Sequence, residues 1–286
     1  MVINKKIKRT MLESKSQYLG SLVLIILSCL LFTMFNLLSI NMSRLSSDFE
    51  KNYHQNDATF MVNTKLADLG ALETKFNVSI EEGRTFDYSV TADKTLRVFS
   101  QNTKVDIPAL IQGNNLSGGG ILIDPAYAKA NKLKPGDSIK IFDKTLKITG
   151  FMSLPNYIYP LKSESDIMSD PNNFGIAVIG KSDFDSLNKG NSFYSIRFNG
   201  DRSDVGGRIT GFKNYLRDNN VIIMSWMNIS DNPRVTYVTA KLKGIDKVSS
   251  SMPVSVLLLT CILTGIVMWR MLKREAVIIG TLYALG

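Results

Sequence analysis

The stretch VSSSMPVSVLLLTCILTGIVMW, residues 248–269, decides the fold because it contains 22 residues without a charged side chain. At about 1.5 Å per residue, a helix of this length crosses a hydrocarbon core of roughly 30 Å. Charge returns immediately after it with Arg270, Lys273, Arg274 and Glu275. The pattern predicts a membrane-spanning helix that ends in a charged collar.

After the collar the chain becomes apolar again, reading AVIIGTLYALG to Gly286. Ala276, Gly280 and Ala284 recur every fourth residue, so a helix would carry them as one stripe of small side chains. The neighbouring face of that helix is apolar, formed by Ile278, Leu282 and Leu285. This arrangement favours a helix that docks against another protein segment, and ordinary packing between two membrane helices would use the same stripe.

A second uncharged run covers residues 16–43, between Lys15 and Arg44. A basic segment precedes it, so a signal peptide is the alternative interpretation. Signal peptides have apolar cores of about 7–15 residues that end in small residues, and this run is longer. The sequence therefore predicts a retained membrane helix.

The net charge of +9 could indicate a partner of opposite charge such as a nucleic acid. The basic side chains, however, concentrate beside the two uncharged runs, while residues 43–251 hold 26 basic and 23 acidic side chains. By the positive-inside rule, both ends are cytoplasmic and residues 43–251 lie outside. We expect no nucleic-acid binding.

Both cysteines, Cys29 and Cys261, lie inside the uncharged runs. The outer region has no cysteine for a disulfide, so its own apolar core must hold it together. With more than 200 residues it is long enough to form that core.

Apolar residues continue at helical spacing beyond both membrane runs. Met42, Leu45 and Phe49 extend the first helix outward as a stalk, and the return stalk carries Val235, Val238, Leu242, Ile245, Val248 and Met252 up to Pro253. Near-heptad spacing of this kind favours two stalks packed on each other. Each stripe could instead be buried separately against the base of the outer domain.

Between the stalks, strand and helix patterns alternate, which indicates an α+β domain. We expect strands at 57–63, 95–100, 121–123, 174–179, 192–198 and 221–224, and helices at 65–76, 125–131 and 205–216. Lys134-Pro135-Gly136-Asp137 has the composition of a type II turn, with glycine at the position of positive φ. Residues 139–148 then read as a hairpin, within a β-rich module inserted near 117–170.

These patterns divide the chain into successive segments. They are a cytoplasmic basic segment (1–17), a first transmembrane helix (18–42), an outward stalk (43–56), an extracytoplasmic domain (57–234), a return stalk (235–252), a second transmembrane helix (253–271) and a cytoplasmic segment (272–286). The expected fold class is therefore a membrane protein, with two transmembrane α-helices flanking an α+β extracytoplasmic domain.

The sequence contains no pattern that predicts catalysis. His54 is the sole histidine, which excludes a His/Cys zinc cluster and a Ser/His/Asp triad. The triple glycine at 118–120 lacks the lysine and hydroxyl of a phosphate-binding loop. We expect neither an enzyme nor a bound cofactor or metal.

The tail REAVIIGTLYALG resembles the signature of FtsX/MacB-like ABC transporter permeases, in which an arginine-rich collar is followed by R-x-E-I-G-x-x-x-A-x-G. Arg274, Gly280, Ala284, Leu285 and Gly286 match that signature. The acidic residue of this chain, Glu275, comes several residues earlier than the acid of the family pattern.

Two further segments carry the resemblance. ILIDPAYAKANKLKPGDSIKI is similar to the periplasmic core domain of MacB-like proteins, with Gly136 and Asp137 in the matching turn. The start KRTMLESKSQYLG looks like the opening of the long, ten-helix members of the family.

The resemblance implies the permease subunit of an ABC transporter in a bacterial plasma membrane. It implies a separate cytoplasmic ABC ATPase that docks at the tail, a possible second permease copy or half, and further membrane helices after Gly286. Movement would pass through the stalks to the outer domain, for export or for mechanical signalling. The alternative from another functional class is a two-helix sensor or scaffold whose outer domain binds a ligand or a cell-wall enzyme.

Overall fold

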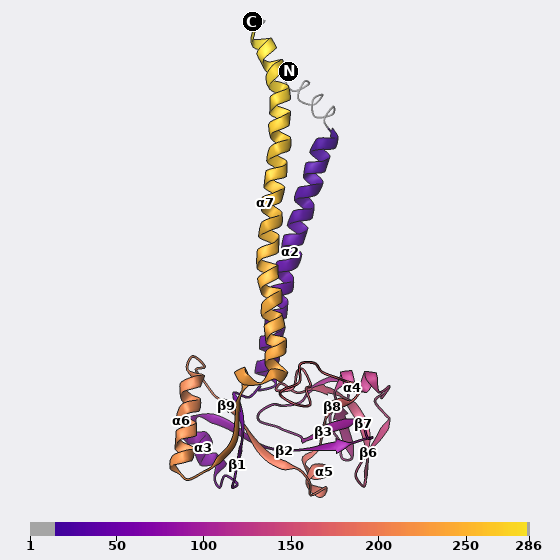
Figure 1. Cartoon of the computed structure of the whole chain (residues 1–286), viewed down its shortest axis with the longest axis vertical. Coiled ribbons are helices and arrows are strands. Elements are labelled where there is room, and N and C mark those ends of the chain that lie inside the picture. Colours follow the sequence, from indigo (N-terminus) through magenta and orange to yellow (C-terminus); the bar gives the residue numbers. More distant parts are fainter. Residues whose placement is uncertain (1–14, 285–286) are drawn as a thin grey trace. The chain divides into compact units, whose positions relative to one another are not determined.

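The structure, a computed structural model, describes residues 15–284 and divides into two compact units (Figure 1). The first, which we call the helix pair, consists of residues 15–45 and 241–284. The second, which we call the sheet domain, consists of residues 46–240. The chain enters the sheet domain at the end of one long helix and leaves it at the start of another.

The two long helices are α2 (Lys15–Asn52) and α7 (Pro233–Ala284). Each runs without interruption through both a predicted stalk and a predicted membrane span. Pro253 lies within α7 and neither starts nor breaks the helix, and its side chain is buried. A proline inside a helix removes one hydrogen bond, here to the Ser249 carbonyl, and the long helical segments on both sides of it maintain the helix.

Both helices are long and apolar enough to cross a membrane. Only 6% of the most apolar window of α2 and 11% of that of α7 is buried. The core helix of a soluble protein would be mostly buried, whereas Leu19, Leu30, Ile40 and Leu258 each expose more than half of their surface. These apolar faces are therefore available to lipid or to other helices.

Within the helix pair, α2 and α7 run antiparallel and contact each other through small polar side chains. The Oγ of Ser28 lies 2.6 Å from the Oγ1 of Thr260, and Ser39 donates a hydrogen bond to Asp246. Between residues 19 and 45, the partly or fully buried positions of α2 recur at heptad spacing apart from Asn36; they are Ser21, Leu24, Ser28, Leu31, Phe35, Asn36, Ser39 and Met42. Small residues at such positions let two helix backbones approach closely.

This contact corrects part of the predicted stalk stripe. Met42 and Leu242 are half-buried as expected, but Leu45 is 66% exposed and Ile245 is 36% exposed. On α7 the buried positions are instead Ser249, Pro253 and Thr260, while Val248 and Met252 are exposed. The most buried positions of the contact face are thus small or polar, with larger apolar side chains such as Leu24 and Leu31 partly buried between them.

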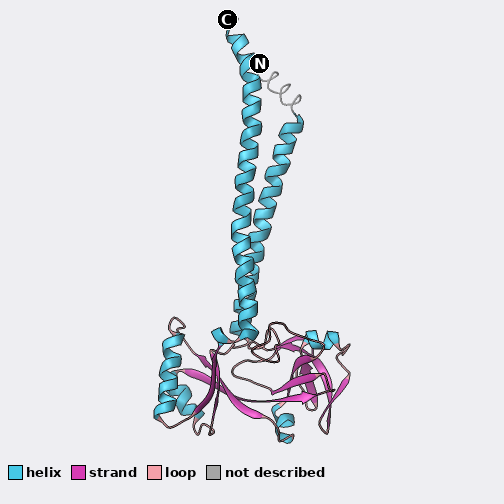
Figure 2. Ribbon diagram, viewed as in Figure 1, coloured by secondary structure: helices cyan, strands magenta, loops and turns pink. Residues whose placement is uncertain are grey.

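The sheet domain is built on one ten-stranded mixed sheet with the order β10-β1-β9-β2-β3-β8-β5-β7-β4, and β6 pairs with β7. Figure 2 shows the strands of this domain in magenta and its helices in cyan. The strands are β1 (Ala58–Val62), β2 (Val78–Ser89), β3 (Thr95–Ser100), β4 (Ala109–Gly113), β5 (Gly120–Ile123), β6 (Ser138–Ile141), β7 (Lys144–Ser153), β8 (Phe174–Ile179), β9 (Asn191–Phe198) and β10 (Ile223–Asn228). The pairs β3–β8 and β5–β7 are parallel and the others antiparallel. The first strand of the domain, β1, therefore lies between its last two strands, β9 and β10.

Four helices cover the sheet. Helices α3 (Leu69–Phe76) and α6 (Val205–Asp218) belong to the apolar cluster around Phe60 and Ile196. Helices α4 (Pro125–Ala130) and α5 (Lys181–Ser186) close a second cluster that includes Ile121 and Ile123. Leu122, between those two isoleucines, joins a third cluster. Because strand side chains alternate between faces, this third cluster lies on the opposite side of the sheet.

The predicted turn at Gly136 is confirmed. Gly136 has φ 102°, the Asp137 amide donates to the Lys134 carbonyl at 3.1 Å, and the Lys134 amide donates to the Asp137 carboxylate at 2.8 Å. The β-rich module that we expected near 117–170 does not form a separate insertion. Strands β4 to β7 lie between β3 and β8 in the sequence, but they extend the same sheet, because β8 pairs with both β3 and β5.

Candidate functional site

Polar contacts concentrate where the two long helices join the sheet domain. We call this region the joint; it consists of residues 46–57, 101–107, 154–166 and 229–240, all of which belong to the sheet domain. It contains the end of α2, the short 3₁₀ helix η1 (Ile229–Asp231) and the first turns of α7.

The linker after α2 is fixed by backbone hydrogen bonds. His54 has a positive φ of 51°, which turns the chain out of the helix, and the Gln55 amide donates to the Glu50 carbonyl at 2.9 Å. The amides of Asp106 and Ile107 donate to the carbonyls of His54 and Tyr53, both at 2.9 Å. The chain that leaves α2 is therefore held against the 101–107 loop like a short strand pair.

Asp106 lies at the centre of the joint and is 1% exposed. Its two carboxylate oxygens accept from the Asn56 amide at 2.9 Å and from the Asn156 side chain at 3.1 Å. Burial raises the pKa of Asp106 to about 7, although donation from the Asn56 amide opposes the shift. The main-chain carbonyl of Asn156 in turn accepts a hydrogen bond from the Asn232 side chain at 2.9 Å. This bond connects Asp106, through Asn156, to the residue just before α7.

A second buried carboxylate, Asp57, connects the same linker to β9. It accepts from the Phe198 amide at 2.7 Å and forms an ion pair with Arg202. Arg197, also on β9, donates to the carbonyls of Gln55 and Glu50. The end of α2 is thus tied to β9, the third strand from one edge of the sheet, by charged groups.

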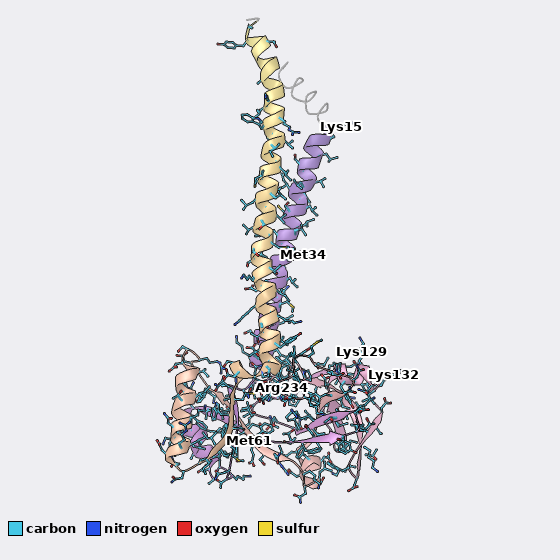
Figure 3. All side chains as sticks on the ribbon, in the orientation of Figure 1. Lys15, Met34, Met61, Lys129, Lys132 and Arg234 are labelled. Atoms are coloured by element: carbon cyan, nitrogen blue, oxygen red, sulfur yellow. The ribbon has the colours of Figure 1, made fainter. Side chains whose placement is uncertain are left out.

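Arg234 ties the first turn of α7 to the 154–166 loop, and Figure 3 labels it at the start of that helix. Its Nε donates to the Leu161 carbonyl at 3.2 Å, and its guanidinium lies 4.6 Å from the ring centroid of Tyr157. The Arg234 carbonyl accepts from the Tyr159 amide at 2.9 Å, and the Tyr159 ring stacks on Tyr237 at 4.1 Å. Both helix ends are therefore fixed to the sheet domain.

A cavity of about 280 Å³ opens beside the joint, entirely within the sheet domain. Most of its apolar wall comes from strands, with Tyr157 added from the 154–166 loop, and the polar groups outside the strands are Asn156, Asn232, Arg234 and Glu164. Within the described residues, the side-chain oxygens of Asn56 and Asn156 accept no hydrogen bond. Two buried amide oxygens of the joint therefore lack a hydrogen-bond donor among these residues.

The predicted coupling residues lie far from the joint in the sequence. Arg274, Glu275, Gly280 and Ala284 belong to the last turns of α7, and a Cβ placed on Gly280 would meet open space. The predicted Leu285 and Gly286 lie outside the described residues. The role of this tail remains a prediction.

The remaining predicted stalk residues, Phe49 and Val238, are half-buried at the two helix ends in the joint, where Phe49 packs on Tyr53 at 5.1 Å. Between residues 15 and 284, no group of three or more His, Cys, Asp or Glu side chains could hold a metal ion.

Sequence reasoning did not identify the joint. The sequence Asp231-Asn232-Pro233-Arg234 carries the signal of a helix start, with a capping residue before proline. It does not reveal which distant groups these side chains meet. Asp106 and Asn156 each lie in loops without a recognisable motif.

No protein-family model and no characterised protein matches this chain. The functional proposal therefore rests on the sequence resemblance and on the geometry of the joint.

Proposed function

We propose that the chain is the membrane subunit, or permease, of an ABC transporter that couples a separate cytoplasmic ATPase to the sheet domain outside the membrane. The observation that carries this proposal is the joint, which fixes the ends of both membrane-length helices to one sheet. The output would be export of a substrate or a mechanical signal to an external partner.

The joint suits the transmission of movement because its buried polar groups are linked to one another. A displacement of the α2 end would act on β9 through Asp57 and Arg197, and a displacement of the α7 start would act on the 154–166 loop through Arg234. Linked buried hydrogen bonds resist partial rupture, because each lost partner leaves a polar group without water. Movement of a helix end would therefore be passed on and not absorbed locally.

The cytoplasmic end would be the tail of α7. Its small-residue stripe, Ala276, Gly280 and Ala284, would let the ATPase or another membrane segment approach closely, and Arg274 and Glu275 would supply charge to that contact. This placement puts both chain ends in the cytoplasm and residues 43–251 outside a bacterial plasma membrane. A second copy or half of the permease would complete the membrane part.

Copurification tests the proposal. The natural full-length protein should copurify with an ATPase that has no membrane helix of its own. Gly280→Leu and Ala284→Leu should reduce the effect of the permease on ATP hydrolysis at least tenfold while leaving expression unchanged. Gly265→Leu, in the same helix and with equally open space, is the matched control. Unchanged coupling in the two tail variants would contradict the docking role.

The cavity beside the joint favours a second candidate, a two-helix sensor or scaffold whose outer domain binds a ligand or a cell-wall enzyme. A sensor needs a ligand site close to the helices that report on it, and Arg234 belongs to both the cavity wall and α7. The copurification experiment separates the two candidates. An ATPase in the complex supports the permease, and its absence supports the sensor.

A further inference from the structure

We propose that the cavity beside the joint binds a small amphipathic carboxylate, with the carboxylate on Arg234 and the apolar portion against the strand side chains. This inference goes beyond the proposed function, because it holds whether or not an ATPase drives the protein.

The apolar wall is built by side chains that project from one face of the sheet. Met61 of β1, Phe99 of β3 and Phe193 of β9 line the cavity together with Tyr157 and Met227. The rings of Phe99 and Phe193 meet edge to face at 6.2 Å, and Phe99 contacts Tyr157 in the same way at 5.2 Å. Such a wall offers a preformed surface for an apolar or aromatic group.

A glycine places one of these rings. A Cβ on Gly83 of β2 would lie 2.4 Å from the ring of Phe193, so that ring lies directly over the strand backbone. A larger residue at position 83 would push Phe193 away from this position. The strand part of the apolar wall is therefore fixed by the sheet, and Tyr157 adds to it from the 154–166 loop.

The charged end of the cavity is Arg234, which is 5% exposed. Its nearest carboxylate, that of Glu164, lies 3.6 Å away, longer than a hydrogen bond, and the Glu164 side chain is 59% exposed. The other neighbours of the guanidinium are the Leu161 carbonyl and the face of Tyr157. A buried guanidinium with such weak charge compensation would gain from a carboxylate that accepts two parallel hydrogen bonds.

The polar wall also holds an unused acceptor. The Oδ1 of Asn156, whose residue is 7% exposed, accepts no hydrogen bond from the described residues. Its amide group is held in place by donation from Nδ2 to Asp106. This oxygen is itself buried, so the polar contact of the ligand in the cavity is assigned to Arg234 alone.

The cavity volume limits the size of the ligand. At about 280 Å³ it is at the lower end of the usual range for ligand sites. It accommodates one apolar side chain with its carboxylate and excludes an entire phospholipid. The carboxyl-terminal residue of a peptide and a short fatty acid share this chemistry.

Isothermal titration calorimetry on the full chain in phosphatidylcholine nanodiscs tests the proposal, with N-acetyl-L-phenylalanine as the probe. N-acetyl-L-phenylalaninamide is the matched control, because it has the same shape without the charge. The acid should bind at least tenfold more tightly than the amide. Hexanoate identifies the source of the ligand: tighter binding of the acetylated residue indicates a peptide terminus, and tighter binding of hexanoate indicates a fatty acid.

Variants test the two walls separately. Arg234→Met should weaken binding of the acid about tenfold or more and leave binding of the amide unchanged. Glu164→Gln should tighten binding of the acid about two- to fivefold, because it removes a competing carboxylate from the same guanidinium. A merely structural role of Arg234 would not produce this gain.

Met61→Trp should abolish binding by filling the cavity without touching Arg234, and Met168→Trp, on the exposed 163–170 loop, is its control. Both variants keep the test valid if Arg234→Met fails to fold. Equal affinity for the acid and the amide, unchanged binding in Met61→Trp, or weaker binding in Glu164→Gln would each overturn the proposal.

Discussion

The helix pair and the joint use polar residues in opposite ways. In the helix pair, the hydroxyls of Ser28 and Thr260 lie within hydrogen-bond distance of each other, and each can instead donate to a carbonyl of its own helix, so their separation leaves no donor without an acceptor. In the joint, Asp57 and Asp106 are buried and accept hydrogen bonds from distant segments. The difference indicates that the helices can shift past each other at low cost, whereas their ends in the sheet domain cannot shift separately from it.

The largest loss of stability is expected for Asp57→Ala, because this substitution removes a buried carboxylate from the joint. The substitution removes the acceptor of the Phe198 amide and the partner of Arg202, and should lower the free energy of unfolding by about 3 kcal/mol. Asp57→Asn keeps an acceptor for the amide and should cost about half as much. Thermal unfolding in detergent measures both, and a loss below about 1 kcal/mol for the alanine variant would mean that the joint is not rigid.

Asp106→Asn should change how the stability of the joint depends on pH. The pKa of Asp106 is raised from 3.8 to about 7, so the folded state holds a proton that the unfolded state has lost. The stabilising contribution of the protonated group is complete below about pH 4 and disappears as the pH rises through 7. Asparagine resembles the protonated acid, so the variant should be more stable than the natural protein at pH 8 by about 2 kcal/mol.

The measurement is the melting temperature of both proteins at pH 5 and pH 8. Asp93→Asn, at an exposed position, should leave the pH profile unchanged. An Asp106→Asn profile as steep as that of the natural protein would show that another group titrates.

Gly136→Ala tests the sheet domain away from the joint. Alanine would adopt a φ of 102° only with strain, although its Cβ would meet open space. We expect a loss of about 1 kcal/mol in unfolding free energy. Gly118→Ala has equally open surroundings and no positive φ, so it should be nearly neutral. Equal effects of the two substitutions in thermal unfolding would refute the role of the turn geometry.

The smallest effect is expected in the helix pair. In a double-mutant cycle of Ser28→Ala and Thr260→Val, the coupling energy should be about 0.6 kcal/mol, as is typical of hydrogen bonds between membrane helices. Thr33→Val, whose hydroxyl bonds within α2, should show no coupling with Thr260→Val. A coupling above about 2 kcal/mol would place the helix pair on a level with the joint and remove the contrast between them.

Much of the sheet domain could be predicted from sequence. The predicted strands at 95–100 and 174–179 have the same bounds as β3 and β8. The second is a continuous apolar run, and the first contains the apolar residues Leu96, Val98 and Phe99. The sequence reading missed β2, which contains Glu81 at a buried position. That carboxylate is satisfied by the amides of Thr103, Lys104 and Val105, and such a tertiary partner leaves no local signal.

The joint was less predictable than the helices for the same reason. Asn56, Asp106, Asn156 and Asn232 form a connected chain of hydrogen bonds, although at least 50 residues separate each from the next. The long uncharged runs at 16–43 and 248–269 located α2 and α7, since the length of such a run is a local property of the sequence. The most buried positions of the contact between the two helices include Ser28, Ser249 and Thr260, and a search for apolar stripes does not identify serine or threonine.

The most direct test is to determine on which side of the membrane the sheet domain and the beginning of α2 lie. In a background with Cys29→Ala and Cys261→Ala, single cysteines would be placed by Ser16→Cys and by Ser165→Cys, both at exposed positions. A membrane-impermeant maleimide applied to intact cells should label the second variant alone, and both after permeabilisation. Labelling of Ser16→Cys in intact cells, or equal labelling of the two variants, would contradict the placement of the sheet domain outside and the helix ends inside.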